Sequence, residues 1–516
     1  MKNLPIGIQT FSKLVEKDML YIDKTEHIYN LINEGSFYFL SRPRRFGKSL
    51  LLSTIKSVFE GKKDLFKGLY IYEKNVWACY PVVHLSMSSF AYSETVEIFK
   101  KDIVFSLNNI GRFYNIILEN NTISGAFGEL LQKLSRQKKV VILIDEYDKP
   151  ILDFITNLSK AKENREVLKE FYSVIKDNDE YIEFCFITGV SKFSKTSVFS
   201  GLNNLKDITI DWRYSTICGY TQDELEFNFA DRFKYLNEEK NVNINELKVE
   251  IKKWYNGYSW DGEKKVYNPF SILNYFDSYR FDNYWFSTGT PTFLVEKFKE
   301  LGLKIEDVKE FKVGKLFFDS FDIEKMDYRF LLFQTGYLTI KKISADGKTF
   351  TLWYPNNEVK DAFLAYIAAS FVNKNPGDIE YINTRLRESL KNNKIDEFIL
   401  ILKSLISGIP YSIHLSYEAY YHSMFYLIME LVGIDMEVEK STIKGRIDGV
   451  IEFEENIYII EFKFLPDKKD TEKILALAIE QIRTKEYFVP YLNKKKTIYF
   501  LAITINKDTI AYKIGN

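Results

Sequence analysis

The sequence predicts an α/β fold in which a parallel β-sheet with flanking helices is followed by a helical region and a smaller α/β domain. Apolar runs of strand length recur between helical segments across residues 37–187, and this alternation indicates parallel strands joined by right-handed crossovers. Near the C-terminus, two neighbouring apolar strands precede a helix and a third strand. Because 516 residues are too many for one hydrophobic core, we expect separate domains.

Composition excludes several classes of protein. Lys and Arg total 71, as do Asp and Glu, so no overall positive field favours nucleic acid, and any such contact needs a local patch. Three cysteines without a C-x-x-C pair predict reduced thiols rather than a disulfide framework or a zinc site. We find no signal-peptide pattern at the N-terminus and no apolar run long enough to span a membrane. The sequence therefore predicts a cytoplasmic protein without a membrane partner.

Residues 37–52 read FYFLSRPRRFGKSLLL, which predicts a strand, a phosphate-binding loop and a helix. In such a loop, backbone N–H groups surround the phosphates, a lysine reaches the β- and γ-phosphates, and a hydroxyl binds Mg²⁺. Lys48 and Ser49 are the candidates, and Gly47 lets the backbone approach the phosphate. Arg42 replaces the first glycine of the usual G-x-x-x-x-G-K-[ST] pattern. By itself, the tripeptide at 47–49 also fits a basic turn that caps a helix.

A second segment makes nucleotide binding the better interpretation. Five apolar residues at 140–144 precede Asp145 and Glu146, as expected for a buried parallel strand whose carboxyl end holds a ligand. We expect Asp145 to hold the Mg²⁺ that Ser49 shares, and Glu146 to polarise the attacking water. By itself, an apolar strand that ends in Asp-Glu is equally typical of a strand followed by a solvated turn. Further strands are predicted at 80–85 and 182–187, and helices at about 48–60, within 93–136 and at about 162–176.

These motifs resemble the AAA-ATPase-like group of P-loop proteins of bacteria and archaea. Besides RPRRFGKS, the matching stretches are LPIG at 4–7, YIDKT at 21–25, IDEYDKP at 144–150 and FSGLNNL at 199–205. The resemblance covers about the first half of the chain and implies ATP binding and hydrolysis with Mg²⁺. It makes Thr188 the candidate γ-phosphate sensor, with Ser191 in reserve and a plain strand-end turn as the alternative. The loop residues that it assigns to nucleotide binding are Arg44, Arg45, Phe46, Gly47, Lys48, Ser49 and Leu50.

The middle of the chain is predicted to be a lid. Thr221 and Glu224 form a capping-box pattern at a helix start. The pairs at 256–257 and 268–269 lie in stretches that match the family's downstream motifs, and we interpret them as turns. Residues 331–343 and 349–354 predict a helix and a β-hairpin, a winged-helix-like unit that covers the nucleotide or binds DNA. We favour a lid because no basic helix is concentrated there. The expected division is 1–215 for the P-loop domain, 216–372 for the lid region and 373–516 for the last domain with its helical lead-in.

Residues 443–463 predict two strands joined by a turn at 454–456. Asp448 lies on the first strand, and Glu461 and Lys463 lie on one face of the second. If the strands pair, Asp448 approaches Glu461; two such carboxylates bind Mg²⁺, and a nearby lysine orients or deprotonates water for phosphodiester attack. Edge strands often carry such charges, but an unpaired carboxylate in an apolar strand is costly.

The last 100 or so residues resemble the PD-(D/E)XK nuclease superfamily, although Ile447 rather than proline precedes Asp448. The resemblance implies catalysis by Asp448, Glu461 and Lys463, a metal held by Asp448, Glu461 and Glu418, and a Gln481 that faces the site. DNA or RNA is the expected partner. Two alternatives stay open: a nucleotide-controlled switch of the signalling-ATPase type whose nuclease-like domain binds without cleaving, and a plain structural assembly. The oligomeric state is also open, with a homo-oligomer among the options.

Overall fold

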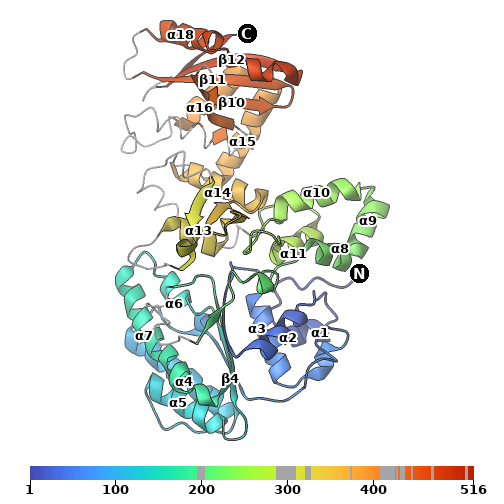
Figure 1. The fold of residues 1–516 in the computed structure, drawn as a ribbon, viewed down its shortest axis with the longest axis vertical. Helices are drawn as coiled ribbons and strands as arrows, with labels where there is room; N and C mark the ends of the chain where they lie inside the picture. The colour runs from blue at the N-terminus through green and yellow to red at the C-terminus, as the bar shows by residue number, and fades with distance from the viewer. Residues whose placement is uncertain are drawn as a thin grey trace. The chain divides into compact units, whose positions relative to one another are not determined.

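The computed structural model describes residues 1–193, 204–285, 310–319, 327–371, 375–406, 425, 428–429, 436–442, 445–465, 470–505 and 510–515. The chain forms two compact units (Figure 1). Unit 1 comprises Met1–Gly289 and Lys312–Val359, and unit 2 comprises Thr290–Phe311 and Lys360–Asn516. Each unit contains a β-sheet with helices, so the predicted α/β fold class is confirmed. The three-domain division at 215 and 372 stays a prediction.

The larger sheet of unit 1 has five parallel strands in the order β2-β3-β4-β1-β5. The central strand β4 and its neighbour β3 are almost entirely buried, as expected when helices cover both faces. Because all five strands are parallel, the residues that follow β1, β3 and β4 lie at one edge of the sheet. The strands are β1 (Phe37–Ser41), β2 (Val82–Ser86), β3 (Val140–Asp145), β4 (Ile182–Gly189) and β5 (Lys206–Asp207).

Helices cover the two faces of this sheet, with α1 to α3 on one side and α4 to α7 on the other (Figure 1). Apolar residues recur on one stripe of each long helix, and those stripes are buried; in α3 they include Leu52, Ile55 and Phe59. The helices are α1 (Phe11–Glu16), α2 (Thr25–Glu34), α3 (Lys48–Phe59), α4 (Val96–Phe113), α5 (Ile123–Leu134), α6 (Lys149–Leu152) and α7 (Leu158–Asp177).

A helical group follows the sheet within unit 1. Its core includes Leu225, Phe229 and Phe276 and extends to Ile22 near the N-terminus. The predicted capping box is confirmed, because the Thr221 side chain accepts from the Glu224 amide and the Glu224 side chain accepts from the Thr221 amide. The helices are α8 (Gln222–Asn228), α9 (Ala230–Lys240), α10 (Ile244–Tyr255) and α11 (Pro269–Ser278).

The predicted helix and hairpin are also present in unit 1. Helix α13 (Tyr328–Thr335) ends at Gly336, which has a φ of 93°, a conformation that glycine adopts without strain. Strands β7 (Thr339–Ile343) and β8 (Thr349–Trp353) pair antiparallel, and β6 (Phe311–Gly314) adds to β8. Helix α14 (Asn357–Phe371) begins in unit 1 and continues into unit 2.

The sheet of unit 2 has the order β13-β12-β11-β10-β9, with β11 and β12 parallel and the other pairs antiparallel. Helix α18 (Thr471–Thr484) joins the parallel pair and packs on one face, and α15 (Pro376–Lys391) and α16 (Ile395–Ile406) lie on the other (Figure 1). None of the described helices is long and apolar enough to cross a bilayer. The strands are β9 (Met436–Thr442), β10 (Gly445–Phe453), β11 (Asn456–Phe464), β12 (Thr497–Ile505) and β13 (Ile510–Gly515).

Candidate nucleotide and metal sites

Lys48 is the first residue of α3, and its side chain folds back over the loop. The amino group donates to the carbonyl oxygens of Arg42 at 2.8 Å and of Pro43 at 2.9 Å. Burial lowers the pKa of Lys48, against the opposing effect of nearby carboxylates, of which Asp145 is the strongest. A phosphate is a stronger partner for an ammonium group than two neutral carbonyls. The two carbonyl contacts of Lys48 therefore close the loop, and an anionic ligand can replace them as the partner of the amino group.

Three predicted residues from three elements meet at the edge of the sheet. The Ser49 hydroxyl on α3 donates to Asp145 Oδ2 at 2.5 Å, and the Thr188 hydroxyl on β4 donates to Asp145 Oδ1 at 2.7 Å. Asp145, the last residue of β3, is 6% exposed. Hydroxyl and carboxylate oxygens are the ligands that Mg²⁺ prefers. The chemistry of this group fits a magnesium ion beside the loop.

Two carboxylates follow β3, and they differ in accessibility. Glu146 is half-buried, has a φ of 52°, and makes no side-chain hydrogen bond or ion pair within the described part of the chain. Asp148 is 1% exposed and accepts from the Ser191 amide and hydroxyl, both at 2.6 Å, and from the Val190 amide at 3.0 Å. Burial raises the pKa of Asp148. Glu146 is the accessible carboxylate, whereas Asp148 and Ser191 hold the loop after β4.

Arg42 has a structural role that the motif does not predict. The side chain is fully buried, and its guanidinium donates to the carbonyl oxygens of Ser41 and Thr209, both at 2.8 Å, and of Tyr214 at 3.1 Å. It also lies 3.9 Å from the centroid of the Trp260 ring. Burial lowers the pKa of Arg42 to about 10, still well above neutral pH. An arginine stands in place of the usual glycine because its side chain fastens the loop to residues 209–214.

Restoring the usual glycine with Arg42→Gly is therefore expected to destabilise unit 1 by about 3 kcal/mol or more, because three buried carbonyls lose charged donors. Arg44→Gly is the matched control, since Arg44 is exposed and its replacement by glycine adds a comparable backbone flexibility to the unfolded chain. Urea unfolding followed by circular dichroism measures both variants. Equal unfolding free energies for the two would show that the guanidinium contacts of Arg42 contribute nothing.

The other predicted loop residues divide into exposed cations and packed side chains. Arg44 and Arg45 are exposed, and Arg45 has a φ of 136°, which is strained for a residue other than glycine. Phe46 is 1% exposed, with its ring centroid 4.7 Å from that of Tyr258 and 5.4 Å from that of Trp260. The side chain of Phe46 therefore anchors the loop by packing against these two rings.

A mainly apolar cavity of about 60 Å³ opens beside Gly47 and Leu50. This volume accommodates about four water molecules. Three segments that are distant in sequence line it, through Pro5, Ile22 and Pro269. Each of the three belongs to a stretch quoted above as a family motif, yet sequence reasoning gave none of them a role in ligand binding. In the sequence, only the family resemblance connects these three segments, because no local pattern links them.

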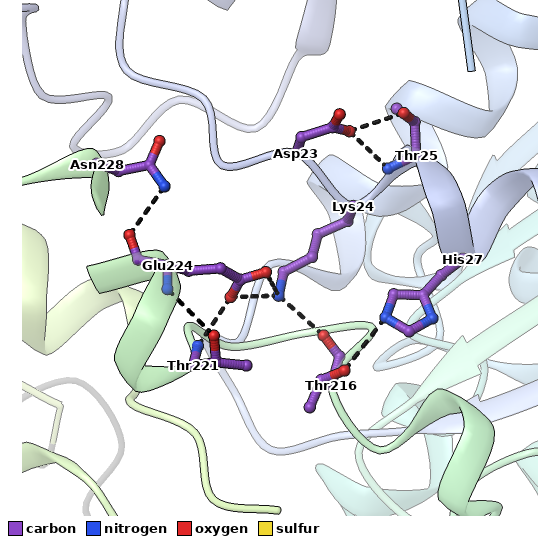
Figure 2. A network of polar contacts seen from close by, with 8 residues as sticks. All are labelled: Asp23, Lys24, Thr25, His27, Thr216, Thr221, Glu224 and Asn228. Carbon is purple, nitrogen blue, oxygen red and sulfur yellow. Dashed lines mark hydrogen bonds and ion pairs between the residues drawn. The ribbon is translucent and has the colours of Figure 1, made fainter. Parts of the chain in front are cut away.

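Lys24 lines this cavity, and its ion pair with Glu224 joins it to α8 (Figure 2). Its amino group contacts both carboxylate oxygens of Glu224, at 2.6 and 2.7 Å, and the Thr216 carbonyl at 2.9 Å. Burial lowers the pKa of Lys24, and the charge of Glu224 opposes that shift. The neighbouring Asp23 accepts from the amide and hydroxyl of Thr25. The YIDKT segment thus fastens the N-terminal part of the chain to the helical group.

The second candidate site lies on the β10–β11 hairpin. Gly449 pairs with Ile460, so the register brings Asp448 level with Glu461, and Asp448 Oδ2 accepts from the Phe462 amide at 2.9 Å. As predicted, Lys463 and Glu461 share a face, with Lys463 Nζ 2.7 Å from Glu461 Oε1.

Glu461 is the most constrained residue of this site. It is 1% exposed, and Gln481 on α18 donates to its Oε1 at 2.5 Å, as the resemblance implies. Its Oε2 is buried and has no hydrogen-bond partner among the described residues. Burial, reinforced by the charge of Asp448, raises the pKa of Glu461 to about 7, against the hydrogen bonds from Lys463 and Gln481. A buried carboxylate oxygen of this kind, beside a second carboxylate, fits a divalent cation.

The predicted third ligand, Glu418, lies outside the described residues. Within the described ranges, no three His, Cys, Asp or Glu side chains group closely enough to hold a metal ion. The structure therefore brings together Asp448, Glu461 and Lys463, and the role of Glu418 stays a prediction.

Comparisons with known proteins match the two parts of the chain that carry these residues. Residues 5–199 match the AAA-ATPase-like family, described as predicted AAA-ATPases, and residues 416–514 match the PD-(D/E)XK nuclease superfamily. A protein from Azotobacter chroococcum mcd 1, described as an uncharacterised protein in the vnfD 5′ region, is 36% identical over 519 residues, which covers 98% of this chain and 97% of the relative. No solved structure is significantly similar to the chain. The chain belongs to the AAA-ATPase-like family and carries a C-terminal domain of the PD-(D/E)XK nuclease superfamily.

Proposed function

We propose that the chain binds and hydrolyses ATP at the loop of residues 42–49 and that its C-terminal domain is a Mg²⁺-dependent nuclease that cuts DNA or RNA. The observation that carries the proposal is the convergence, in each unit, of carboxylates and a lysine from different parts of the chain. In unit 1 they are Asp145 at the end of β3 and Lys48 at the start of α3, whose neighbour Ser49 donates to Asp145, and in unit 2 they are Asp448, Glu461 and Lys463.

At the first site, Lys48 binds the β- and γ-phosphates, and the backbone N–H groups of residues 44–49 surround them. Ser49 and Asp145 would hold Mg²⁺, which supplies neutralising charge when bound. Thr188 contacts Asp145 from β4, a position suited to sensing the γ-phosphate. The cavity beside Gly47 and Leu50 has apolar walls of the kind that hold nucleotide bases, and at about 60 Å³ it must widen to admit adenine.

Glu146→Gln is expected to retain ATP binding and to slow hydrolysis by about 10²-fold, because an amide cannot accept a proton from the attacking water. Phosphate release and a binding titration on the same preparation measure the two properties separately. The control is Glu180→Gln, an exposed carboxylate elsewhere in unit 1. Turnover at the wild-type rate in the Glu146 variant would assign the catalytic carboxylate to another residue.

At the second site, Asp448 and Glu461 would hold the metal, which supplies charge stabilisation at the scissile phosphate when bound. Lys463 orients or deprotonates the attacking water, and Gln481 holds the Glu461 carboxylate in place. Metal binding at this site requires the Glu461 carboxylate to be deprotonated.

The test is a pair of assays on the full chain. ATP turnover is measured with Mg²⁺ and with EDTA, and end-labelled DNA and RNA are incubated with Mg²⁺ or Mn²⁺, with and without ATP. We expect both activities to require the metal. ATP turnover without cleavage of any substrate would favour the signalling-ATPase alternative, and the absence of ATP binding would refute the first half of the proposal.

A further inference from the structure

Six residues later in the chain contact the phosphate loop, and we name them the clamp: Tyr258, Trp260, Phe270, Trp285, Gln334 and Gly336. Every residue from Ser41 to Phe46 contacts one of them. Ser41 Oγ donates to Gln334 Oε1 at 2.8 Å, and a Cβ added at Gly336 would lie 2.7 Å from Pro43 Cβ. The Arg44 carbonyl accepts from the Trp285 indole at 2.8 Å. Arg42 lies over the Trp260 ring, Arg45 lies over the Phe270 ring, and Phe46 packs on Tyr258.

Trp285 has a second polar contact, made by its backbone rather than its ring. Its backbone N–H donates to Glu358 Oε1 at 2.7 Å, and the Ser271 hydroxyl contacts both oxygens of the same carboxylate, at 2.8 and 3.0 Å. Glu358 is fully buried and is the second residue of α14. One residue therefore touches both the phosphate loop and the start of the helix through which the chain passes from unit 1 to unit 2.

Ligand binding must change the part of the loop that the clamp holds. Lys48 binds the carbonyls of Arg42 and Pro43, so a nucleotide that draws Lys48 to its phosphates releases two buried acceptors. Arg45, two residues further on, already has a strained backbone. Contacts that differ between two states of a site are what couples that site to another. The clamp contacts the loop at the residues where the two states must differ.

We propose that Trp285 is a positioning residue that transmits nucleotide occupancy of the loop, through Glu358 and α14, to the nuclease domain, so that the bound nucleotide controls cleavage. The inference rests on the proposed function. A nucleoside triphosphate, whose γ-phosphate engages Lys48, is the effector. Thermodynamic coupling of this kind changes an equilibrium by about 5- to 150-fold.

The test variant is Trp285→Phe, which retains an aromatic ring and the backbone N–H to Glu358 but lacks the indole donor to Arg44. Trp353→Phe on β8 is the matched control, because this half-buried tryptophan has a ring contact with its neighbour Tyr354 and no hydrogen bond to the loop within the described part of the chain. Three properties of the full chain are measured: the affinity for a non-hydrolysable ATP analogue, amide hydrogen exchange of residues 357–371 with and without the analogue, and the cleavage rate in both conditions.

In the wild type and in Trp353→Phe, we expect the analogue to change the exchange of residues 357–371 and the cleavage rate by at least about fivefold. Trp285→Phe is expected to bind the analogue within about threefold of wild type, with both responses reduced below about twofold. Wild-type-sized changes in exchange and cleavage in Trp285→Phe would overturn the inference. Exchange of residues 357–371 that does not change when the wild type binds the analogue would also overturn it, and this result does not depend on the folding of any variant. Failure of the wild type to bind the analogue would instead refute the proposed ATP site, and an exchange response without cleavage would refute the nuclease and, with it, nucleotide control of cleavage.

Discussion

Lys48→Ala is expected to remove ATP binding, with a loss of about 3 kcal/mol or more, or at least about 10²-fold in Kd. Lys48 is the lysine that the loop holds 2.8 and 2.9 Å from its own carbonyls, at the position from which the β- and γ-phosphates are reached. Alanine leaves the phosphate charge without this buried partner. Isothermal titration with ATP and Mg²⁺ measures the effect.

Lys56→Ala is the control for this prediction. Lys56 lies on the same helix, and its partly exposed amino group is 3.8 Å from Glu60, a surface pair that contributes little. We expect its nucleotide affinity to match wild type. Unchanged affinity in Lys48→Ala as well would mean that residues 42–49 do not form the nucleotide site.

Lys463→Ala is expected to reduce metal-dependent cleavage by about 10³-fold and to leave ATP turnover unchanged, because the P-loop lies in the other unit. Asp448→Ala should abolish cleavage and also weaken Mn²⁺ binding, since it removes a ligand rather than the cation that orients water. Melting temperature, ATP turnover and cleavage of DNA and RNA are measured on the same proteins.

Lys473→Ala, on the exposed side of α18, is the matched control for this second prediction. If Lys463 only solvates a face of β11, its replacement should behave like that control, with a stability change of about 0.5 kcal/mol or less and no change in activity. Cleavage at the wild-type rate by Lys463→Ala would therefore end its assignment as a nuclease residue.

The elements that the sequence predicts well are those encoded by local patterns. The apolar run at 140–144 forms β3, the leucines after Ser49 lie on α3, and the Thr221 capping box begins α8. The β10–β11 hairpin follows from two apolar strands and a short turn. In each case the periodicity or the cap lies within about 20 residues, so the information is contained in one stretch of sequence.

Features that depend on distant contacts were not predictable in this way. Arg42 interrupts a motif because the carbonyls of Thr209 and Tyr214 need its guanidinium, and nothing near residue 42 indicates those partners. Likewise, the cavity beside Gly47 is assembled from residues near 5, 22 and 269. The Trp285 contacts join residues 241 and 73 positions apart. Such contacts become visible only when the chain has folded.

A crystal structure of the full chain with a non-hydrolysable ATP analogue and Mn²⁺ tests the two-site account most directly, because anomalous scattering locates the metal independently of its ligands. We expect one Mn²⁺ between the phosphates, Ser49 and Asp145, and another at Asp448 and Glu461, with the Glu418 carboxylate completing the second site and Lys463 beside it. A nucleotide bound away from residues 42–49, or an Asp448–Glu461 pair that holds no metal while Glu418 points elsewhere, would contradict it.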